Sequence, residues 1–173
     1  PDQQKALSLV GIAEADETFF LESFKGKKQG MTRAPRKRGS KAAKRGLSDE
    51  QIPVLICRDR TGSTTDFVLE KADKTHISAA LKPILASDVV LCTDSAKALS
   101  AAVKEIGITH RPINLAAGIR VVGKVYHVQN VNAYDSRLKT WVRRFHGVAT
   151  HYLHNYLGWR RLIDRSHNIL SPD

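Results

Sequence analysis

Two strand-like runs of this chain each carry an aspartate at a position where a buried strand is normally apolar. Asp16 lies inside Ile12–Phe20, and Asp94 closes Val89–Asp94. A buried carboxylate costs several kcal/mol, roughly, unless it is paired or binds a cation. Because ligands of α/β sheets gather at the carboxyl ends of strands, two such runs lying side by side predict a Mg²⁺ site. A shared metal site at Asp16 and Asp94 therefore requires a fold in which the two runs are neighbouring strands.

The spacing of apolar residues predicts the order of the elements. Three strands form a meander, and a helix, a strand, a helix, a strand and closing helices follow. The expected strands are 9–21, 52–58, 64–69, 88–93 and 108–114, and the expected helices are 75–85 (capped by Thr75), 96–106, 131–145 and 148–164. The 173 residues suit one domain, 1–173, and are too few for two. The pattern predicts an α/β fold with a mixed five-stranded sheet flanked by helices.

The first strand has two chemically different faces. Its period of two places Glu14 and Asp16 on one face, and Ala13 and Ala15 on the other. The small alanines predict a closely packed helix on their side. The acidic face is the unusual one, although a buried and hydrogen-bonded structural role for Asp16 is the alternative to a metal ligand.

The long helix near the C-terminus carries a second polar set. Asn132, Asp135 and Lys139 lie on one face beside the buried stripe, so that Asn132 and Lys139 are stacked two turns apart. Asn132 is expected to open this helix, and a helix-capping role competes with a functional one. Asp94 has the same competing role, because a helix follows it directly.

Positive charge is concentrated in one segment. The formal net charge is +11 and the pI is about 9.9, which indicates a polyanionic partner such as DNA, RNA or an anionic membrane face. Glycines and a proline interrupt any regular period, so we expect a basic insertion loop at about 25–49 that is poorly ordered without nucleic acid. A solvated loop with no partner is the alternative. The cations expected to contact phosphates are Lys25, Lys27, Lys28, Arg33, Arg36, Lys37, Arg38, Lys41, Lys44, Arg45, Arg143, Arg144, Arg160 and Arg161.

Other features exclude several classes of protein. No apolar run approaches the roughly 18 to 20 residues of a membrane-spanning helix, and the N-terminus has no secretory signal. We therefore expect a soluble, cytoplasmic, nucleoid-associated protein. Cys57 and Cys92 lie in apolar runs and are expected to be buried free thiols. Three histidines without the cysteines of a zinc cluster are expected to be solvated: His146, His151 and His154.

Three motifs together resemble the catalytic domain of bacterial insertion-sequence DDE transposases, which has a ribonuclease-H-like fold. They are Asp16 within Glu-Ala-Asp-Glu-Thr, Asp94 within Cys-Thr-Asp-Ser, and the run from His127 to Lys139. The resemblance covers roughly residues 9 to 159. In that family two aspartates and a third polar residue, usually Glu, bind divalent metal. This sequence resembles a branch with Asn in the third position and Lys seven residues later.

The resemblance implies a role for each matching residue. Asp16 would bridge two Mg²⁺ (or Mn²⁺) ions, Asp94 and Asn132 would each help to hold one, and Lys139 would position a phosphate. The implied activity is metal-dependent cleavage and strand transfer of double-stranded DNA at transposon ends and target. The protein could assemble as a homo-oligomer on this DNA. His127 matches a histidine common in the motif, to which the resemblance assigns no role.

Two departures from the family pattern affect these expectations. The usual zinc-binding and helix-turn-helix reader does not precede the first strand, so we expect a catalytic fragment or a domain without its reader. Asn132 is a neutral ligand that holds a hard cation less tightly than a carboxylate, and Asp135 or Glu14 could supply the missing charge. Three other functions stay open: a non-catalytic domesticated DNA-binding module, a nuclease or junction resolvase of the same fold, and a basic structural protein.

Overall fold

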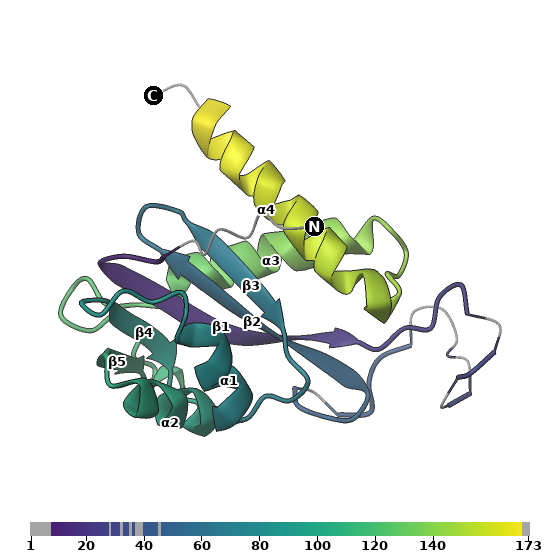
Figure 1. The fold of residues 1–173 in the computed structure, drawn as a ribbon, viewed down its shortest axis with the longest axis horizontal. Coiled ribbons are helices and arrows are strands. Elements are labelled where there is room, and N and C mark those ends of the chain that lie inside the picture. Colours follow the sequence, from purple (N-terminus) through teal and green to yellow (C-terminus); the bar gives the residue numbers. More distant parts are fainter. Residues whose placement is uncertain are drawn as a thin grey trace.

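The computed structural model describes residues 8–170 except 28, 32, 35, 37–39 and 45. Figure 1 shows a central sheet with helices on both sides. The elements in chain order are β1 (Ile12–Leu21), β2 (Gln51–Asp59), β3 (Thr64–Val68), α1 (Lys74–Leu81), β4 (Val90–Asp94), α2 (Lys97–Ile106), β5 (Thr109–Ile113), α3 (Gln129–Arg143) and α4 (Leu153–Leu170). Short 3₁₀ helices, Leu115–Ala117 and Thr150–Tyr152, precede α3 and α4.

The sheet has the strand order β3-β2-β1-β4-β5. The β1–β2 and β2–β3 pairs are antiparallel, whereas β1–β4 and β4–β5 are parallel. The predicted mixed five-stranded α/β sheet is therefore confirmed. On the β4 side the last paired residue of β1 is Ala15, opposite Thr93, whereas on the β2 side pairing continues to Leu21. Beyond Ala15, the β4 edge of β1 has no neighbouring strand.

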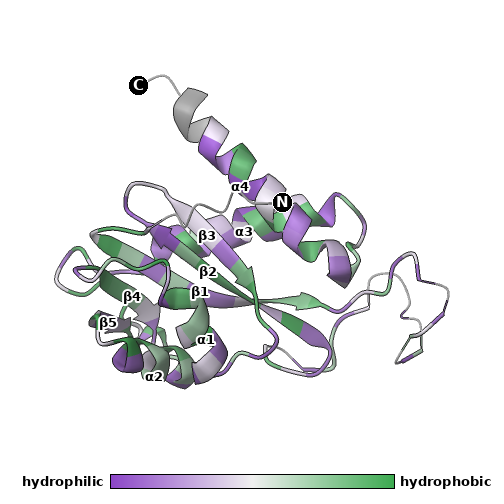
Figure 2. Ribbon diagram, viewed as in Figure 1, coloured by the Kyte–Doolittle hydropathy of each residue, from purple (hydrophilic) through white to green (hydrophobic). Residues whose placement is uncertain are grey.

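Each face of the sheet is covered by its own helices. Ala13 and Ala15 pack against α1 and α2, which confirms the predicted helix on the alanine side of β1. On the opposite face α3 and the start of α4 pack in a second cluster. Cys57 and Cys92 are buried free thiols in these two clusters, as expected. Figure 2 shows that hydrophobic residues are concentrated in the sheet, whereas hydrophilic residues are frequent along α4.

Ion pairs attach α4 to the sheet. Asp164 accepts from Arg58 of β2 at 2.6 Å and lies 3.6 Å from Arg160, and both arginines are largely buried. Arg161 pairs with Asp66 of β3. Arg160 is buried beside Asp164 of its own helix and Arg161 is paired with Asp66, so neither guanidinium group is free in this structure for the DNA contact expected of it. Among the described residues, no helix has the length and hydrophobicity needed to cross a membrane.

The first helix differs from its prediction at both ends. Asp73, not Thr75, is the N-cap, and its carboxylate accepts from the backbone N–H of His76 at 2.9 Å. Asp73 precedes Lys74, the first residue of the helix, so its carboxylate is placed to accept from the third helical residue, whereas Thr75 already lies inside the first turn. The helix ends at Leu81, and its C-cap Lys82 still has helical backbone angles; Pro83, which has no backbone N–H, cannot donate the next bond of the helix.

The last helices also begin at residues other than those predicted. α3 starts at Gln129, so Asn132 is its fourth residue and not its opening one. α4 starts at Leu153 and not at Val148, because a turn follows α3 in which His146 and Gly147 have φ values of 50° and 103°. A right-handed helix cannot include residues with positive φ, so the turn separates α3 from α4.

The predicted basic insertion connects β1 to β2, and we call residues 22–50 the arm. The described residues of the arm form no helix or strand. Arg33 binds the backbone carbonyl of Glu22 at 2.7 Å and its carboxylate at 3.4 Å, and Arg36 pairs with Glu50 at 2.7 Å. Four of the arm's predicted DNA contacts lie outside the described residues: Lys28, Lys37, Arg38 and Arg45.

Candidate metal centre

Three carboxylates meet where β4 ends. One carboxylate oxygen from each of Asp16, Glu17 and Asp94 lies within 4.8 Å of the other two. The parallel β1–β4 pair is in register through Ala15 and Thr93, so the next residue of each strand projects at the same edge. Among the described residues, this is the one group of three or more His, Cys, Asp or Glu side chains close enough to share a metal ion.

Glu17 is the member that the sequence does not predict. Alternation along a strand places it on the opposite face from Asp16. However, β4 ends at Asp94, so no neighbouring strand separates the two faces of β1 at this point. Both side chains can therefore turn toward the open edge. The sequence signal for Glu17 was its position directly after Asp16. That signal indicates a third carboxylate in the cluster only once it is known that β4 ends at Asp94.

Burial and like charge both disfavour ionisation of this cluster. The pKa of Asp16 is raised to about 7, first by burial and then by the charges of Asp94 and Glu17. Burial and the charge of Asp94 also raise the pKa of Glu17 to about 7. A backbone N–H of Glu17 donates to Asp16 at 2.9 Å and offsets part of the effect. A bound divalent cation would remove this repulsion.

Asp94 is held in a turn between β4 and α2. Its Oδ1 accepts from the backbone N–H of Ala96 at 3.0 Å. The N-cap of α2 is Ala96, and no side chain caps that helix. Asp94 therefore does not act as the N-cap, although it does orient the backbone leading into α2. Its second oxygen has no hydrogen-bond partner among the described residues, which leaves it free for a ligand.

The polar face of α3 lies opposite the cluster. Asp135 contributes to the raised pKa of Asp16, which places its charge near the three carboxylates. Lys139 pairs with Asp135 Oδ2 at 2.8 Å, whereas Oδ1 is buried without a partner among the described residues. Asn132 is half-buried one turn earlier. The capping interpretation of Asn132 is wrong, because the N-cap is Val128 and the backbone N–H of Asn132 already donates to it at 3.2 Å.

A buried carboxylate from β1 fixes the start of α3. Glu14 is fully buried, and its Oε2 accepts from the backbone N–H of Val131 at 2.9 Å. Its Oε1 pairs with Arg60 and lies 3.3 Å from His127 Nδ1. Glu14 thus satisfies a first-turn donor of α3 from another element. The expectation that Glu14 could supply charge to the metal is wrong, because both of its oxygens are already engaged.

His127 belongs to the same network. Its Nδ1 lies 3.2 Å from Arg60 Nη1 and 3.2 Å from the backbone N–H of Gln129, both of which are donors. Burial and the nearby Arg60 lower the pKa of His127, so the ring is neutral near pH 7 with its proton on Nε2. The motif histidine, for which the sequence gave no role, therefore helps to close the loop that leads into α3.

The family comparison agrees with this geometry. Residues 8–160 match the family described as the ISXO2-like transposase domain, and the match includes the acidic cluster and α3. The chain belongs to this family. No match was found among curated proteins or among solved structures. The predicted insertion-sequence transposase and its ribonuclease-H-like fold are confirmed, and membership implies divalent-metal use and DNA binding. The Asn-and-Lys branch stays a prediction.

Glu14→Ala should destabilise the transposase domain by about 3 kcal/mol, because it removes the carboxylate that pairs with the half-buried Arg60 and leaves a buried α3 donor without a partner. Glu14→Gln should cost less, since its amide oxygen can still accept from Val131. Urea unfolding followed by circular dichroism measures both, with the exposed Glu70→Ala as a control expected within about 0.5 kcal/mol of the parent. A cost below about 1 kcal/mol for Glu14→Ala would show that the network is unimportant for folding.

Asp94→Asn should raise the Tm of the metal-free transposase domain at about pH 8. The folded pKa values of Asp16 and Glu17, about 7, exceed their ordinary values of 3.8 and 4.5. Unfolding therefore becomes easier as the pH rises from about 4 to 7, and the full cost is present above pH 7. Asparagine removes one repelling charge and keeps the acceptor for Ala96. Each kcal/mol gained corresponds to about 2–4 °C.

The same melts with Mg²⁺ or Mn²⁺ complete this test. The parent domain should gain Tm on metal addition, because a ligand that binds only the folded state stabilises it. Asp94→Asn should lose most of this gain, whereas the exposed Asp88→Asn should behave as the parent in both conditions. An equal metal-induced gain in Asp94→Asn and the parent would remove Asp94 from the metal centre.

Proposed function

We propose that this transposase domain cleaves and joins DNA strands with two divalent cations held at the end of β4. The convergence of Asp16, Glu17 and Asp94 is the observation that carries the proposal. These are oxygen donors, which Mg²⁺ and Mn²⁺ prefer. The cluster also fits a cation electrostatically, because its members repel one another when ionised.

The residues around the cluster have separate tasks in this proposal. Asp16 has a carboxylate oxygen within 4.8 Å of those of Glu17 and Asp94, and would help to hold both cations, with Asp94 and Asn132 each helping to hold one. When bound, the cations would promote attack by water or a DNA 3′-hydroxyl and stabilise the leaving oxygen. Glu17 adds a carboxylate that compensates for the neutral amide of Asn132. Asp135 holds Lys139, whose ammonium group would position a phosphate.

The arm and the C-terminal end of α3 would bind double-stranded DNA, both transposon ends and target. Lys41, Lys44, Arg143 and Arg144 are exposed and have no ion-pair partner among the described residues. Arg33 and Arg36 have a different task, since both are already paired with glutamates. In this proposal Arg33 and Arg36 order the arm, and the four exposed cations bind phosphates. Assembly of a homo-oligomer on the DNA remains part of the proposal.

Asp16→Ala and Asp94→Ala should each abolish Mg²⁺-dependent cleavage and strand transfer, because each removes a cation ligand. DNA affinity measured in EDTA should change less than about twofold, since neither carboxylate contacts a phosphate directly. Gel assays of cleavage and joining, run beside anisotropy titrations, separate the two effects. Activity retained in both variants would reject the catalytic proposal and favour a non-catalytic DNA-binding module; cleavage without joining in the parent would favour a nuclease or resolvase.

Metal titrations identify the remaining ligands. Asn132→Ala and Glu17→Gln should each raise the Mg²⁺ concentration needed for half-maximal activity, because the first removes an oxygen ligand and the second removes charge. Asn132→Asp should lower that concentration or leave it unchanged. Glu105→Gln, an exposed glutamate on α2, is the matched control. If both Asn132 variants leave the half-maximal Mg²⁺ concentration unchanged and Asp135→Asn raises it, Asp135 and not Asn132 is the third metal ligand beside Asp16 and Asp94.

Lys41→Ala/Lys44→Ala should reduce the salt dependence of DNA binding. Each lost phosphate contact lowers the slope of log affinity against log salt by about 0.9 for duplex DNA. The control Lys82→Ala/Lys104→Ala removes the same charge from the C-cap of α1 and from α2, on the other side of the sheet, and should leave the slope nearly unchanged. Equal slopes for the two double variants would show that the arm is only solvated.

A further inference from the structure

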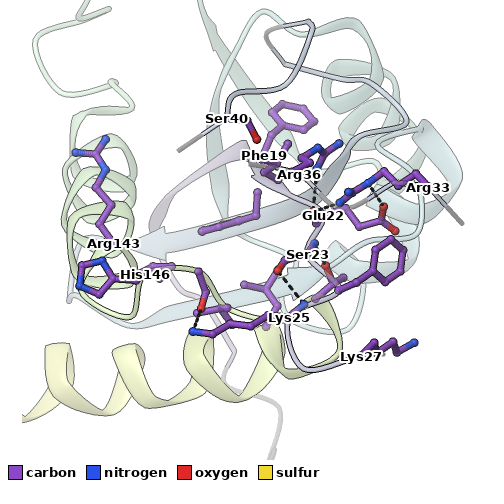
Figure 3. A pocket seen from close by; sticks show the side chains of 18 of the residues that line it. Phe19, Glu22, Ser23, Lys25, Lys27, Arg33, Arg36, Ser40, Arg143 and His146 are labelled. Atoms are coloured by element: carbon purple, nitrogen blue, oxygen red, sulfur yellow. Dashed lines mark hydrogen bonds and ion pairs between the residues drawn. The ribbon is translucent and has the colours of Figure 1, made fainter. Parts of the chain in front are cut away.

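A groove of about 960 Å³ lies between the end of β1, the arm and the turn that follows α3 (Figure 3). Its floor is apolar and includes Phe20, Val142 and Leu153. Its walls are cationic, with Lys25, Lys27, Arg33, Arg36, Lys139 and Arg143. This volume is at the upper end of the roughly 300–1,000 Å³ typical of pockets that enclose a ligand. The metal centre described above uses none of this floor.

The groove is held open by contacts between its walls. Lys25 Nζ donates to the carbonyls of Phe145 at 3.1 Å and Gly147 at 2.9 Å, and Figure 3 shows this side chain reaching across to the turn after α3. Ser23 and Thr150 exchange two hydrogen bonds of 2.9 Å. The start of the arm is therefore fixed to the α3–α4 connection on one side of the groove.

The opposite wall presents a planar cation. The Arg33 guanidinium lies 5.1 Å from the centre of the Phe24 ring, and the Lys27 ammonium lies 5.8 Å from it. Arg33 is also held by Glu22, so its plane is fixed before any ligand arrives. Aromatic rings and guanidinium planes are the surfaces on which unpaired bases stack.

Charge identifies the chemical class of the occupant. Glu22 is the one acid among the described lining residues, and Arg33 already neutralises it. Arg36 and Lys139 are also paired, with Glu50 and Asp135. Lys27 and Arg143 are exposed and have no ion-pair partner among the described residues, so these two cations favour a polyanion. Phosphates suit the rim, whereas the apolar floor and the Phe24–Arg33 pair suit flat bases. A base pair inside a duplex presents only its edges to a protein, so stacking in this groove requires an unpaired strand.

The groove continues from the metal centre. Phe20 lies four residues after Asp16 on the same face of β1, about 13 Å away at the usual rise per residue. Lys139 lines the groove and also pairs with Asp135, which lies near Asp16. Four nucleotides cover this distance at the duplex rise of about 3.4 Å each, and an unpaired strand is more extended, so a strand with one phosphate at the carboxylates would reach the groove within about four nucleotides.

We propose that this groove binds unpaired nucleotides of a DNA strand whose scissile phosphate lies at Asp16 and Asp94. The inference rests on the proposed strand-cleavage function and adds a substrate requirement to it: the DNA near the cut is locally single-stranded. Phosphates lie along Lys27 and Arg143, and a base stacks on the Phe24–Arg33 pair.

Anisotropy titrations in EDTA test this inference without any cleavage. The probes are a blunt duplex and duplexes of the same total length with a single-stranded tail at the 3′ or at the 5′ end. The parent domain should bind one tailed duplex about tenfold more tightly than the blunt one, as expected for one stacked base. Phe24→Leu, which keeps apolar bulk, and Arg33→Lys, which keeps charge, should each reduce this preference to about twofold or less.

Two further variants keep the test decisive. Arg143→Ala, at the exposed rim, should lower tail affinity severalfold even if Phe24→Leu does not fold, and Lys104→Ala on α2 should leave the tail preference unchanged. Equal binding of blunt and tailed duplexes by the parent overturns the inference, as does a preference that Arg33→Lys and Arg143→Ala leave intact. A preference for tailed duplexes without metal-dependent cleavage overturns the proposed function but supports the inferred nucleotide-binding groove. Metal-dependent cleavage without a preference for tailed duplexes overturns the inferred groove but supports the proposed function.

Discussion

The unequal length of two parallel strands is the constraint on which the site depends. β4 ends at Asp94, while β1 continues past Asp16 with β2 as its remaining neighbour. The open edge allows three carboxylates to approach from both faces of β1, and burial, followed by their mutual repulsion, raises the pKa values of Asp16 and Glu17 to about 7. Such an arrangement is unfavourable without a cation, which is the usual cost of a preorganised metal site. The remaining structure holds this edge in place.

The Glu14 network is the main device that relates α3 to the acidic edge. Glu14 and Asp16 share one face of β1 and are two residues apart. The carboxylate of Glu14, which binds the first turn of α3, is therefore next to Asp16 of the acidic cluster on that face. Any shift of α3 along β1 would unpair a fully buried charge. The helix residues Asn132, Asp135 and Lys139 are thus placed by a contact at Val131, which precedes them by one, four and eight residues. His127 contributes by accepting hydrogen bonds, not by reaching the cluster.

The arm shows how a very basic segment is used for two purposes. Arg33 and Arg36 pair with glutamates at the two ends of the arm, where burial makes paired arginines favourable. Lysines such as Lys41 and Lys44 stay exposed, and the α4 arginines at 160 and 161 are used against Asp164 and Asp66. Counting cations therefore overestimates the number that are free for phosphates. The groove between the arm and α3 exists because some of these cations fold back onto the protein.

The sequence by itself determined the α/β class, the order of strands along the chain, the alanine face of β1, and Asp16 and Asp94 as strand-end acids, since these follow from local periodicity. The family followed from the resemblance of its three motifs. The sequence could not determine Glu17, because alternation within β1 places that residue on the wrong face until the end of β4 is known. It misassigned Thr75, Glu14, Arg160 and Arg161, because capping and ion pairing depend on which partner arrives from elsewhere in the chain. Tertiary structure alone decided these partners, since a buried charge is stable only beside the opposite charge or donor that packing brings to it.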